Sequence, residues 1–339
     1  MRKIFRRLLI IGFMFLLALP GCNNDGPPTD QVISQETTDT QANPSDSQTS
    51  EPVTNSEQAS DRNTDFGFES KAVVLNSGYK MPIIGLGTFT LDNETAENSV
   101  YHALKSGYRL IDTAKYYKNE EGVGNGVRRA IAEGIVTRAD VFITTKILPS
   151  GFGDYDVAIN ACNEQLGLDY IDLMLIHQQG PDEKKLYRAI GKAISDGKVR
   201  SLGISNYYTR EAFDRITADA EILPAVVQNE NHPYYQNTEL QEYVSQYGTI
   251  VESYYPLGGR GHTQDLFRDE TIAELTQSYD KTSPQILLRW HIQAGYIAIP
   301  GSSNPEHIAE NYDIFDFELS EEEMQKIADM NTGERYESW

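Results

Sequence analysis

Three side chains suited to proton transfer follow three consecutive apolar segments of the chain. Asp112, Lys146 and His177 each come where such a segment ends. A charged side chain is rarely buried without a partner, and Asp112 and Lys146, from neighbouring segments, are able to pair with each other. Any one of the three alone is better explained as a solvated strand end, but three in succession indicate an acid–base site. The stretch DTAKYYKNE (112–120) is then either a surface loop or part of that site.

The segments that must position these residues are eight short apolar runs, separated by amphipathic stretches of helix length. Several runs are apolar almost throughout, as in strands that are buried on both faces. Between the first two runs, Val100, Leu104 and Tyr108 recur at helical spacing, and glycine ends this helical stretch and others. The alternation predicts an α/β fold with one domain, a (β/α)8 TIM barrel. The eight runs are 83–89, 109–113, 141–146, 171–177, 199–205, 225–230, 249–254 and 296–300.

A doubly wound sheet is the competing fold, and it would normally carry a phosphate-binding loop after its first strand. The glycines of GVGNGVRRA (122–130) have the wrong spacing for such a loop, so we interpret them as the start of a helix. VVLNSGYKMP (73–82) has the pattern of a β-hairpin. We expect this hairpin to plug the N-terminal end of the barrel and an extra helix to follow the barrel at its C-terminus.

Barrel enzymes carry their active sites at the C-terminal ends of the strands. Besides the three residues above, Ser205 and Asn206, Gln228 and Tyr254 end predicted strands or lie close to their ends. The sequence therefore predicts a polar cluster at one mouth of the barrel.

The composition excludes some classes of function. The formal net charge is −21, which argues against nucleic acid as a partner because phosphates demand basic patches. The two cysteines, Cys22 and Cys162, form no disulfide framework, and the six histidines show no metal-binding spacing. We therefore expect no metal.

The first 22 residues have the pattern of an export signal. A basic start is followed by an apolar run, Leu8 to Leu19, that is too short to span a bilayer comfortably. Leu19-Pro20-Gly21-Cys22 resembles a bacterial lipobox, in which the cysteine is lipidated; a plain signal peptide with an incidental cysteine is the alternative. Arg6-Arg7 partly resembles a twin-arginine signal, although the very apolar run favours the ordinary export route.

These features predict three parts. Residues 1–22 are a lipoprotein signal peptide with Cys22 as the lipidated residue, 23–66 are a disordered polar tether, and 67–339 are the barrel. The expected location is extracytoplasmic, lipid-anchored to a bacterial cell membrane.

Several motifs of the barrel resemble those of the aldo-keto reductases, in particular the diketogluconate-reductase-like bacterial branch. The resemblance covers nearly all of residues 70–335. Its motifs are IDTAKYYKNE, ITTK, LIH, GKVRSLGISN, PAVVQNENHPYYQ, SYYPLG and IPGSSNPEHIAENYDIFDFELSEEEM, in that order along the chain.

The resemblance assigns roles to the strand-end residues. It implies reduction of an aldehyde or ketone by a nicotinamide coenzyme, with Tyr117, five residues after Asp112, as the proton donor. Lys146 would favour the phenolate, Asp112 would hold the ammonium, and His177 would orient the substrate oxygen. Tyr116 has the wrong offset and is expected to be a packing residue.

The same resemblance implies a binding site for NADP(H) or NAD(H). The implied contacts with the coenzyme are Gly87, Thr88, Ser205, Asn206, Gln228, Tyr254, Leu257, Ser302, Glu310 and Asn311, with Tyr254 stacking on the nicotinamide ring.

Departures from the family pattern affect both ends of the ligand. Many members of the family have IPKS, whose lysine binds the 2′-phosphate of NADP, but this chain has IPGS, with Gly301 in place of that lysine. A nearby arginine of the family pattern is replaced by His307, so two fixed positive charges are missing. Gln178 replaces a common tryptophan, which indicates a more polar pocket for a small carbonyl or sugar-like substrate. Phe89, Tyr336 and Trp339 are either walls of that pocket or ordinary packing residues.

The sequence therefore predicts a carbonyl reductase that acts as a monomer. The alternative is a membrane-tethered module that binds or senses the coenzyme with little turnover. A hydrolase would need paired carboxylates or a metal at the mouth, and the sequence shows neither.

Overall fold

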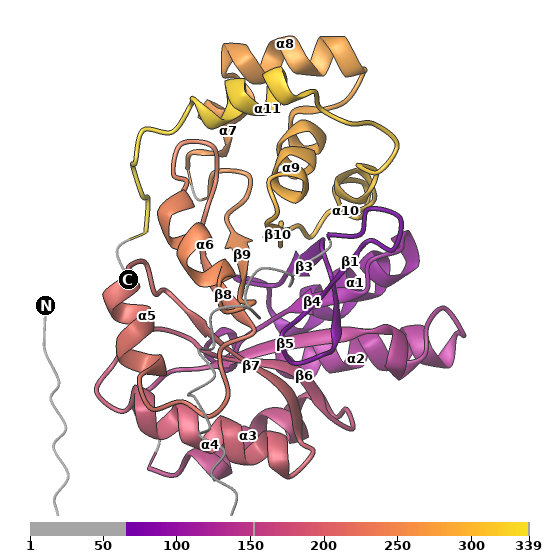
Figure 1. Cartoon of the computed structure of the whole chain (residues 1–339). Coiled ribbons are helices and arrows are strands. Elements are labelled where there is room, and N and C mark those ends of the chain that lie inside the picture. The colour runs from indigo at the N-terminus through magenta and orange to yellow at the C-terminus, as the bar shows by residue number, and fades with distance from the viewer. Residues whose placement is uncertain (1–65, 152, 260, 338–339) are drawn as a thin grey trace, which may run out of the picture. The chain divides into compact units, whose positions relative to one another are not determined.

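The computed structural model describes residues 66–151, 153–259 and 261–337 (Figure 1). The predicted signal peptide, the lipidation of Cys22, nearly all of the tether and the pocket role of Trp339 lie outside the described residues.

The described chain forms a barrel of eight parallel strands, as the alternating apolar runs predict (Figure 1). Every residue of the third and fourth barrel strands is buried, which explains why most of their residues are apolar, and their two charged residues, Lys146 and Asp172, form ion pairs. The strands are β3 (Gly85–Gly87), β4 (Leu110–Asp112), β5 (Phe142–Ile147), β6 (Ile171–Ile176), β7 (Val199–Ser205), β8 (Val226–Glu230), β9 (Ile250–Tyr254) and β10 (Ile297–Ala298).

Two backbone bridges close the barrel between its first and last strands. Ile84 pairs with Ala298, and Gly87 pairs with Gly301. The Gly87 N–H donates to Pro300 O at 3.0 Å. A Cβ on Gly87 would lie 2.9 Å from Ile299 O, so the closure needs a residue without a side chain at this point.

Helices connect successive strands around the barrel. α1 begins at the Asp92 cap, whose side chain accepts from Thr95 N, and ends at Gly107 with φ of 110°. The helices are α1 (Asn93–Ser106), α2 (Glu120–Ala132), α3 (Tyr155–Leu166), α4 (Glu183–Ser195), α5 (Arg210–Thr217), α6 (Thr238–Ser245), α7 (Thr263–Phe267), α8 (Glu270–Tyr279), α9 (Ser283–Gln293), α10 (Pro305–Tyr312) and α11 (Glu321–Ala328), with 3₁₀ turns η1 (Lys115–Tyr117) and η2 (Arg138–Asp140).

The glycines of GVGNGVRRA lie in α2, near its start. A Cβ on Gly122 would lie 2.1 Å from Asn93 O, and one on Gly124 would lie 1.8 Å from Leu166 O. These glycines therefore let α2 approach its neighbours closely, and the interpretation as the start of a helix is confirmed.

The predicted hairpin is present as β1 (Ala72–Val74) and β2 (Lys80–Pro82), which pair antiparallel. Its turn contacts the N-terminal side of the barrel: Asn76 Nδ2 donates to Pro224 O, just before β8, and Ser77 Oγ lies 2.8 Å from Ser201 Oγ near the start of β7. The expected plug is confirmed, and α11 is the expected extra C-terminal helix.

Candidate active site

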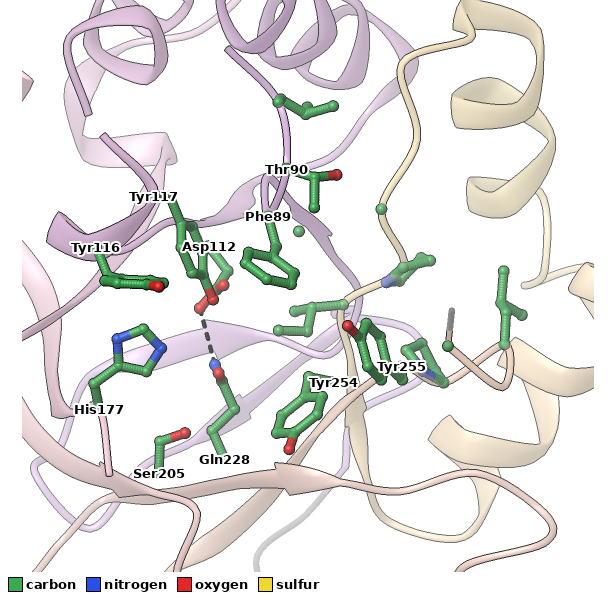
Figure 2. A pocket seen from close by; sticks show the side chains of 18 of the residues that line it. Phe89, Thr90, Asp112, Tyr116, Tyr117, His177, Ser205, Gln228, Tyr254 and Tyr255 are labelled. Carbon is green, nitrogen blue, oxygen red and sulfur yellow. Dashed lines mark hydrogen bonds between the residues drawn. The ribbon is translucent and has the colours of Figure 1, made fainter. Parts of the chain in front are cut away.

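A cavity of about 650 Å³ opens at the carboxyl ends of the strands (Figure 2). Its walls come from β8 and from the loops that follow β3, β4, β5, β6, β7, β9 and β10. This volume lies within the range of small-molecule sites, about 300–1,000 Å³. The polar residues predicted at the strand ends therefore surround one candidate ligand site.

Asp112 and Lys146 form a buried ion pair beneath this cavity. Their strands are neighbours, with Asp112 opposite Thr144 in the β4–β5 register. Lys146 Nζ lies 2.6 Å from Asp112 Oδ1 and also donates to Thr113 O at 2.9 Å. The Lys146 and Asp112 side chains are 0% and 3% exposed. If one of them were removed, water could not solvate the charge of the other.

Tyr117 lies at the end of η1, directly over this ion pair. Lys146 Nζ donates to its hydroxyl oxygen at 3.3 Å. The Tyr117 ring centroid is 4.8 Å from that of Phe89 and 5.6 Å from that of His177. Figure 2 shows these rings together at one end of the cavity.

Burial, more than charge, controls the protonation of the phenol. It raises the pKa of Tyr117, and the Lys146 charge opposes this rise only in part. Burial also lowers the pKa of Lys146, but attraction to Asp112 and to Tyr117 outweighs it, so the net pKa is raised. Lys146 favours the phenolate as expected, but burial outweighs it, so the pair is an ammonium and a neutral phenol at neutral pH.

His177 lines the cavity with a neutral ring. Burial first, and then the Lys146 charge, lower the pKa of His177 to about 3. Its Nδ1 is buried and has no hydrogen-bond partner among the described residues. Nε2 is therefore the nitrogen that remains to serve a ligand in the cavity.

Amides and hydroxyls form the opposite side of the cavity. Ser205, Asn206, Gln228 and Tyr254 all line it. Asn206 Nδ2 donates to His177 O at 2.9 Å, and Asn206 Oδ1 accepts from the Tyr254 hydroxyl at 2.9 Å. Gln228 Nε2 donates across the barrel to Asp112 Oδ2 at 2.8 Å, the dashed line of Figure 2.

The remaining expected coenzyme contacts divide into two groups. Gly87, Leu257 and Ser302 line the cavity. Thr88 does not: it is fully buried, and its hydroxyl donates to Asp112 O at 2.9 Å, so it supports the aspartate's strand end rather than the ligand surface. Glu310 and Asn311, on α10, are also outside the cavity lining.

Two of the expected pocket residues, Phe89 and Gln178, line the cavity. Tyr116 requires correction, whereas for Tyr336 the structure favours packing over the other role that the sequence left open. Tyr116 is not a packing residue, because it is 57% exposed and lines the same cavity. Tyr336 is not a cavity wall: its ring stacks on His262, with the ring centroids 3.7 Å apart.

The sequence reasoning missed two residues that contact the site. Glu252, on β9, is fully buried and accepts from Gln228 Nε2 at 2.7 Å. Tyr208 donates to Asn206 Oδ1 at 3.1 Å, and its hydroxyl lies 2.8 Å from that of Tyr254. The spacing offered a signal for Glu252, because it precedes Tyr254 by two residues and alternate strand residues share a face.

Backbone strain concentrates around the cavity. Among the described residues, six non-glycine residues have positive φ. Four of them, Thr90, Lys118, Asn206 and Tyr255, lie in the loops that follow β3, β4, β7 and β9. Such conformations cost free energy and persist where packing over-determines them, which is common at functional sites.

The C-terminal segment is attached to the same end of the barrel through Glu230. This carboxylate is fully buried and accepts from the backbone N–H groups of Tyr336 at 2.7 Å and Glu337 at 2.9 Å. The Tyr255 hydroxyl donates to Glu337 Oε1 at 3.0 Å. The end of β8 therefore holds the tail beside the loop that follows β9.

Within residues 66–337 as described, no group of three or more histidine, cysteine or carboxylate side chains is placed to hold a metal ion. No helix in this part of the chain is long and apolar enough to cross a membrane.

Comparisons with known proteins agree with this geometry. Residues 83–332 match the model of the aldo/keto reductase family. The glyoxal reductase of Bacillus subtilis is 41% identical over 268 residues, which cover 78% of this chain and 94% of that protein. The NAD(P)H-dependent D-xylose reductase I,II of Candida tropicalis is 36% identical over 304 residues, which cover 78% of this chain and 93% of that protein.

A solved structure shares the fold as well as the sequence. The Bombyx mori aldo-keto reductase in complex with NADP superposes with a TM-score of 0.72 at 34% identity, covering 78% of this chain and 94% of that one. The chain therefore belongs to the aldo/keto reductase family.

Proposed function

We propose that the protein is an NAD(P)H-dependent reductase of aldehydes and ketones, with Tyr117 as its proton donor. One observation carries the proposal. The Tyr117 hydroxyl, the buried Lys146–Asp112 pair and the neutral His177 ring converge at one end of a cavity whose opposite side presents amides and hydroxyls.

The residues on that opposite side fit a nicotinamide. The Gln228 amide nitrogen donates its two hydrogens to the carboxyl groups of Asp112 and Glu252. The amide oxygen of Gln228 has no hydrogen-bond partner among the described residues. The Ser205 hydroxyl can donate to a carboxamide oxygen, and the Tyr254 ring offers a flat surface for stacking. A bound NAD(P)H supplies the hydride.

The protein's own groups handle the carbonyl oxygen of the substrate. His177 and Tyr117 donate hydrogen bonds to it and fix its position. The raised pKa of Tyr117 keeps the phenol protonated until negative charge develops on that oxygen, when the proton moves to it. The phenolate left behind faces the Lys146 ammonium, which Asp112 holds in place.

The pocket favours a small polar substrate. Gln178, Tyr116 and Tyr255 add an amide and two phenols to its lining. We infer a small carbonyl or sugar-like substrate, of the kind named for the glyoxal and xylose reductase relatives. On its motifs we place the chain in the diketogluconate-reductase-like branch of the family.

The adenosine end supports use of both coenzymes. Gly301 has no side chain to bind a 2′-phosphate, and His307 on α10 is exposed and lacks the fixed charge of an arginine. We propose that NADH is usable and that preference for NADPH is weaker than in relatives with IPKS.

The sequence features of the N-terminus support an extracytoplasmic location, with Cys22 lipidated, residues 23–66 as the tether and residues 67–339 as the catalytic domain. We propose that the protein acts as a monomer. The acidity of the chain disfavours nucleic acid as a partner.

The test is oxidation of NADH and NADPH by the purified protein with a panel of small aldehydes and sugars. Steady turnover in the wild type, lost in a Lys146→Met variant that still binds coenzyme, supports the proposal. Tight coenzyme binding without turnover in the wild type would instead favour a tethered binding or sensing module.

A further inference from the structure

Glu252 is a carboxyl in the barrel interior that the proposed chemistry does not use. It lies in β9, beside Gln228 of β8 in the strand register and beside Ile297 of β10 on the other side. Its side chain is fully buried. Oε2 accepts from Gln228 Nε2 at 2.7 Å, whereas Oε1 is buried without a partner among the described residues.

The Gln228 amide is bound from two sides. Its nitrogen donates to Glu252 on the neighbouring strand and to Asp112 on the opposite wall of the barrel, 2.8 Å away. An amide nitrogen carries two hydrogens, and both are thereby used. The amide oxygen is the group that remains for the cavity. The orientation of an amide is decided by such partners.

We propose that Glu252 is a positioning residue, which fixes the Gln228 amide so that its oxygen faces the cavity and accepts a hydrogen bond from the NH₂ group of the nicotinamide carboxamide. This inference rests on the proposed function, because it requires that a nicotinamide coenzyme binds in this cavity. Asp112 takes one hydrogen of the amide nitrogen, and Glu252 takes the other.

The ionisation of the cluster supports this role. The ionisable groups around Glu252 are Asp112 on β4, Lys146 on β5 and the Tyr117 phenol. Burial, and then the Asp112 charge, raise the pKa of Glu252 to about 8. At neutral pH the carboxyl is therefore protonated and still offers a carbonyl oxygen as acceptor, while the Asp112 and Lys146 charges balance each other.

Two substitutions separate the acceptor from the charge. Glu252→Gln keeps an acceptor oxygen at nearly the same position and cannot ionise. Glu252→Leu has a similar size and no acceptor, so one hydrogen of the Gln228 nitrogen loses its partner and the amide gains an alternative orientation with N–H toward the cavity. The first variant should retain the positioning, and the second should lose it.

A coenzyme analogue reports the orientation of the amide. In the 3-acetylpyridine analogue of NADH an acetyl group replaces the carboxamide, so the ring substituent keeps its oxygen and has no N–H. The wild type should bind NADH more tightly than this analogue, because the Gln228 oxygen finds no donor on the acetyl group. In Glu252→Leu the ratio of the two dissociation constants should fall by about tenfold, the worth of one neutral hydrogen bond.

Glu252→Gln is the control for the apolar variants, because it keeps the acceptor oxygen and cannot ionise. Glu252→Gln should keep the wild-type ratio and should remove any step near pH 8 from the pH profile of coenzyme binding. Glu252→Val provides the same comparison with a smaller apolar side chain if the leucine is not accommodated. An unchanged ratio in a folded apolar variant, or an equal change in Glu252→Gln, would overturn the inference and leave the proposed function intact. Failure of the wild type to bind either NADH or NADPH would overturn the proposed function itself.

Discussion

Gln228 and Asp112 lie on opposite walls of the barrel and are joined by a 2.8 Å hydrogen bond through its interior. Asp112 uses its other oxygen for Lys146, and Lys146 contacts the Tyr117 hydroxyl. The group that would bind the coenzyme and the group that would donate the proton therefore belong to one buried network. Substitution of Gln228 or Asp112 should therefore affect both coenzyme binding and turnover, whereas loss of the Tyr117 hydroxyl should lower turnover and leave coenzyme binding nearly unchanged.

Tyr117→Phe should lower kcat by roughly 10²–10⁴-fold, because it removes the proton donor and keeps the ring. Coenzyme binding, measured by titration of protein fluorescence, should be nearly unchanged. The matched control is Tyr116→Phe, which alters the exposed neighbour and should leave kcat nearly as it is. The reverse pattern would mean that the proton donor has been misassigned.

Asp112→Asn should lower the free energy of unfolding by about 3–5 kcal/mol, since it leaves the Lys146 ammonium buried without its counter-ion. Urea unfolding followed by circular dichroism measures the change. The control is Glu322→Gln, which breaks a surface ion pair with Lys326 and should cost less than about 0.5 kcal/mol, because the Lys326 and Glu322 side chains are 51% and 81% exposed. Equal losses in the two variants would contradict the buried-pair interpretation.

Stability should fall as the pH is lowered below about 6.5, in part through His177. In the folded protein the pKa of His177 is depressed to about 3, against an ordinary value of 6.5, so between these values the unfolded chain binds a proton that the folded chain does not. His177→Gln should make the decline between pH 6 and pH 5 shallower by up to about 1.4 kcal/mol per pH unit.

The matched comparison is His291, another buried histidine, whose pKa burial depresses to about 4. It should still titrate in His177→Gln, so this variant retains part of the slope. A slope equal to that of the wild type would show that His177 is not held neutral in the folded state.

His307→Arg should tighten NADPH binding by about 1–3 kcal/mol and leave NADH binding nearly unchanged, because an exposed guanidinium at the start of α10 can bind a 2′-phosphate. Gly301→Lys is a less clean test, since its Cβ would lie 3.1 Å from Gly87 O in the barrel closure. Paired titrations with both coenzymes, with His307→Ala as the control, measure the effect. A wild type that binds NADPH a thousandfold more tightly than NADH would show that other groups bind the phosphate.

Cys22→Ser should release the protein from the membrane fraction or mislocalise it, because the expected anchor is the acyl chain on this cysteine. The measurement is fractionation together with labelled fatty acid. Cys162→Ser provides a control, since that thiol is buried in the barrel. Label on the Cys22→Ser protein would contradict the assignment.

The sequence was informative where function needs particular residue types at strand ends. The apolar runs predicted all eight barrel strands, and the ends of three of them carry Asp112, Lys146 and His177, which the structure brings to one mouth. A strand end is recognisable from the sequence because the apolar pattern stops there. The hairpin was recognisable for a similar reason, through the turn signal between its strands.

The sequence did not reveal interactions that cross the barrel. Glu252 lies inside a buried strand and appears in the sequence only as a polar residue beside Ser253, whereas its importance comes from Gln228 and Asp112 nearby in space. Tyr116 was misjudged, and the role of Tyr336 was left open, for the same reason. Their exposure and partners depend on a turn and a tail, whose paths the residue pattern does not specify.

The attachment of the tail to Glu230 has a consequence for biosynthesis. Its two backbone donors belong to Tyr336 and Glu337, which are translated after all eight barrel strands. While the ribosome still holds them, all eight strands have been translated, but the Glu230 carboxylate lacks both donors. The mouth of the barrel is therefore completed only once residues 336 and 337 have left the ribosome, and a nascent chain held before that point would carry all eight strands with the Glu230 carboxylate still without these donors.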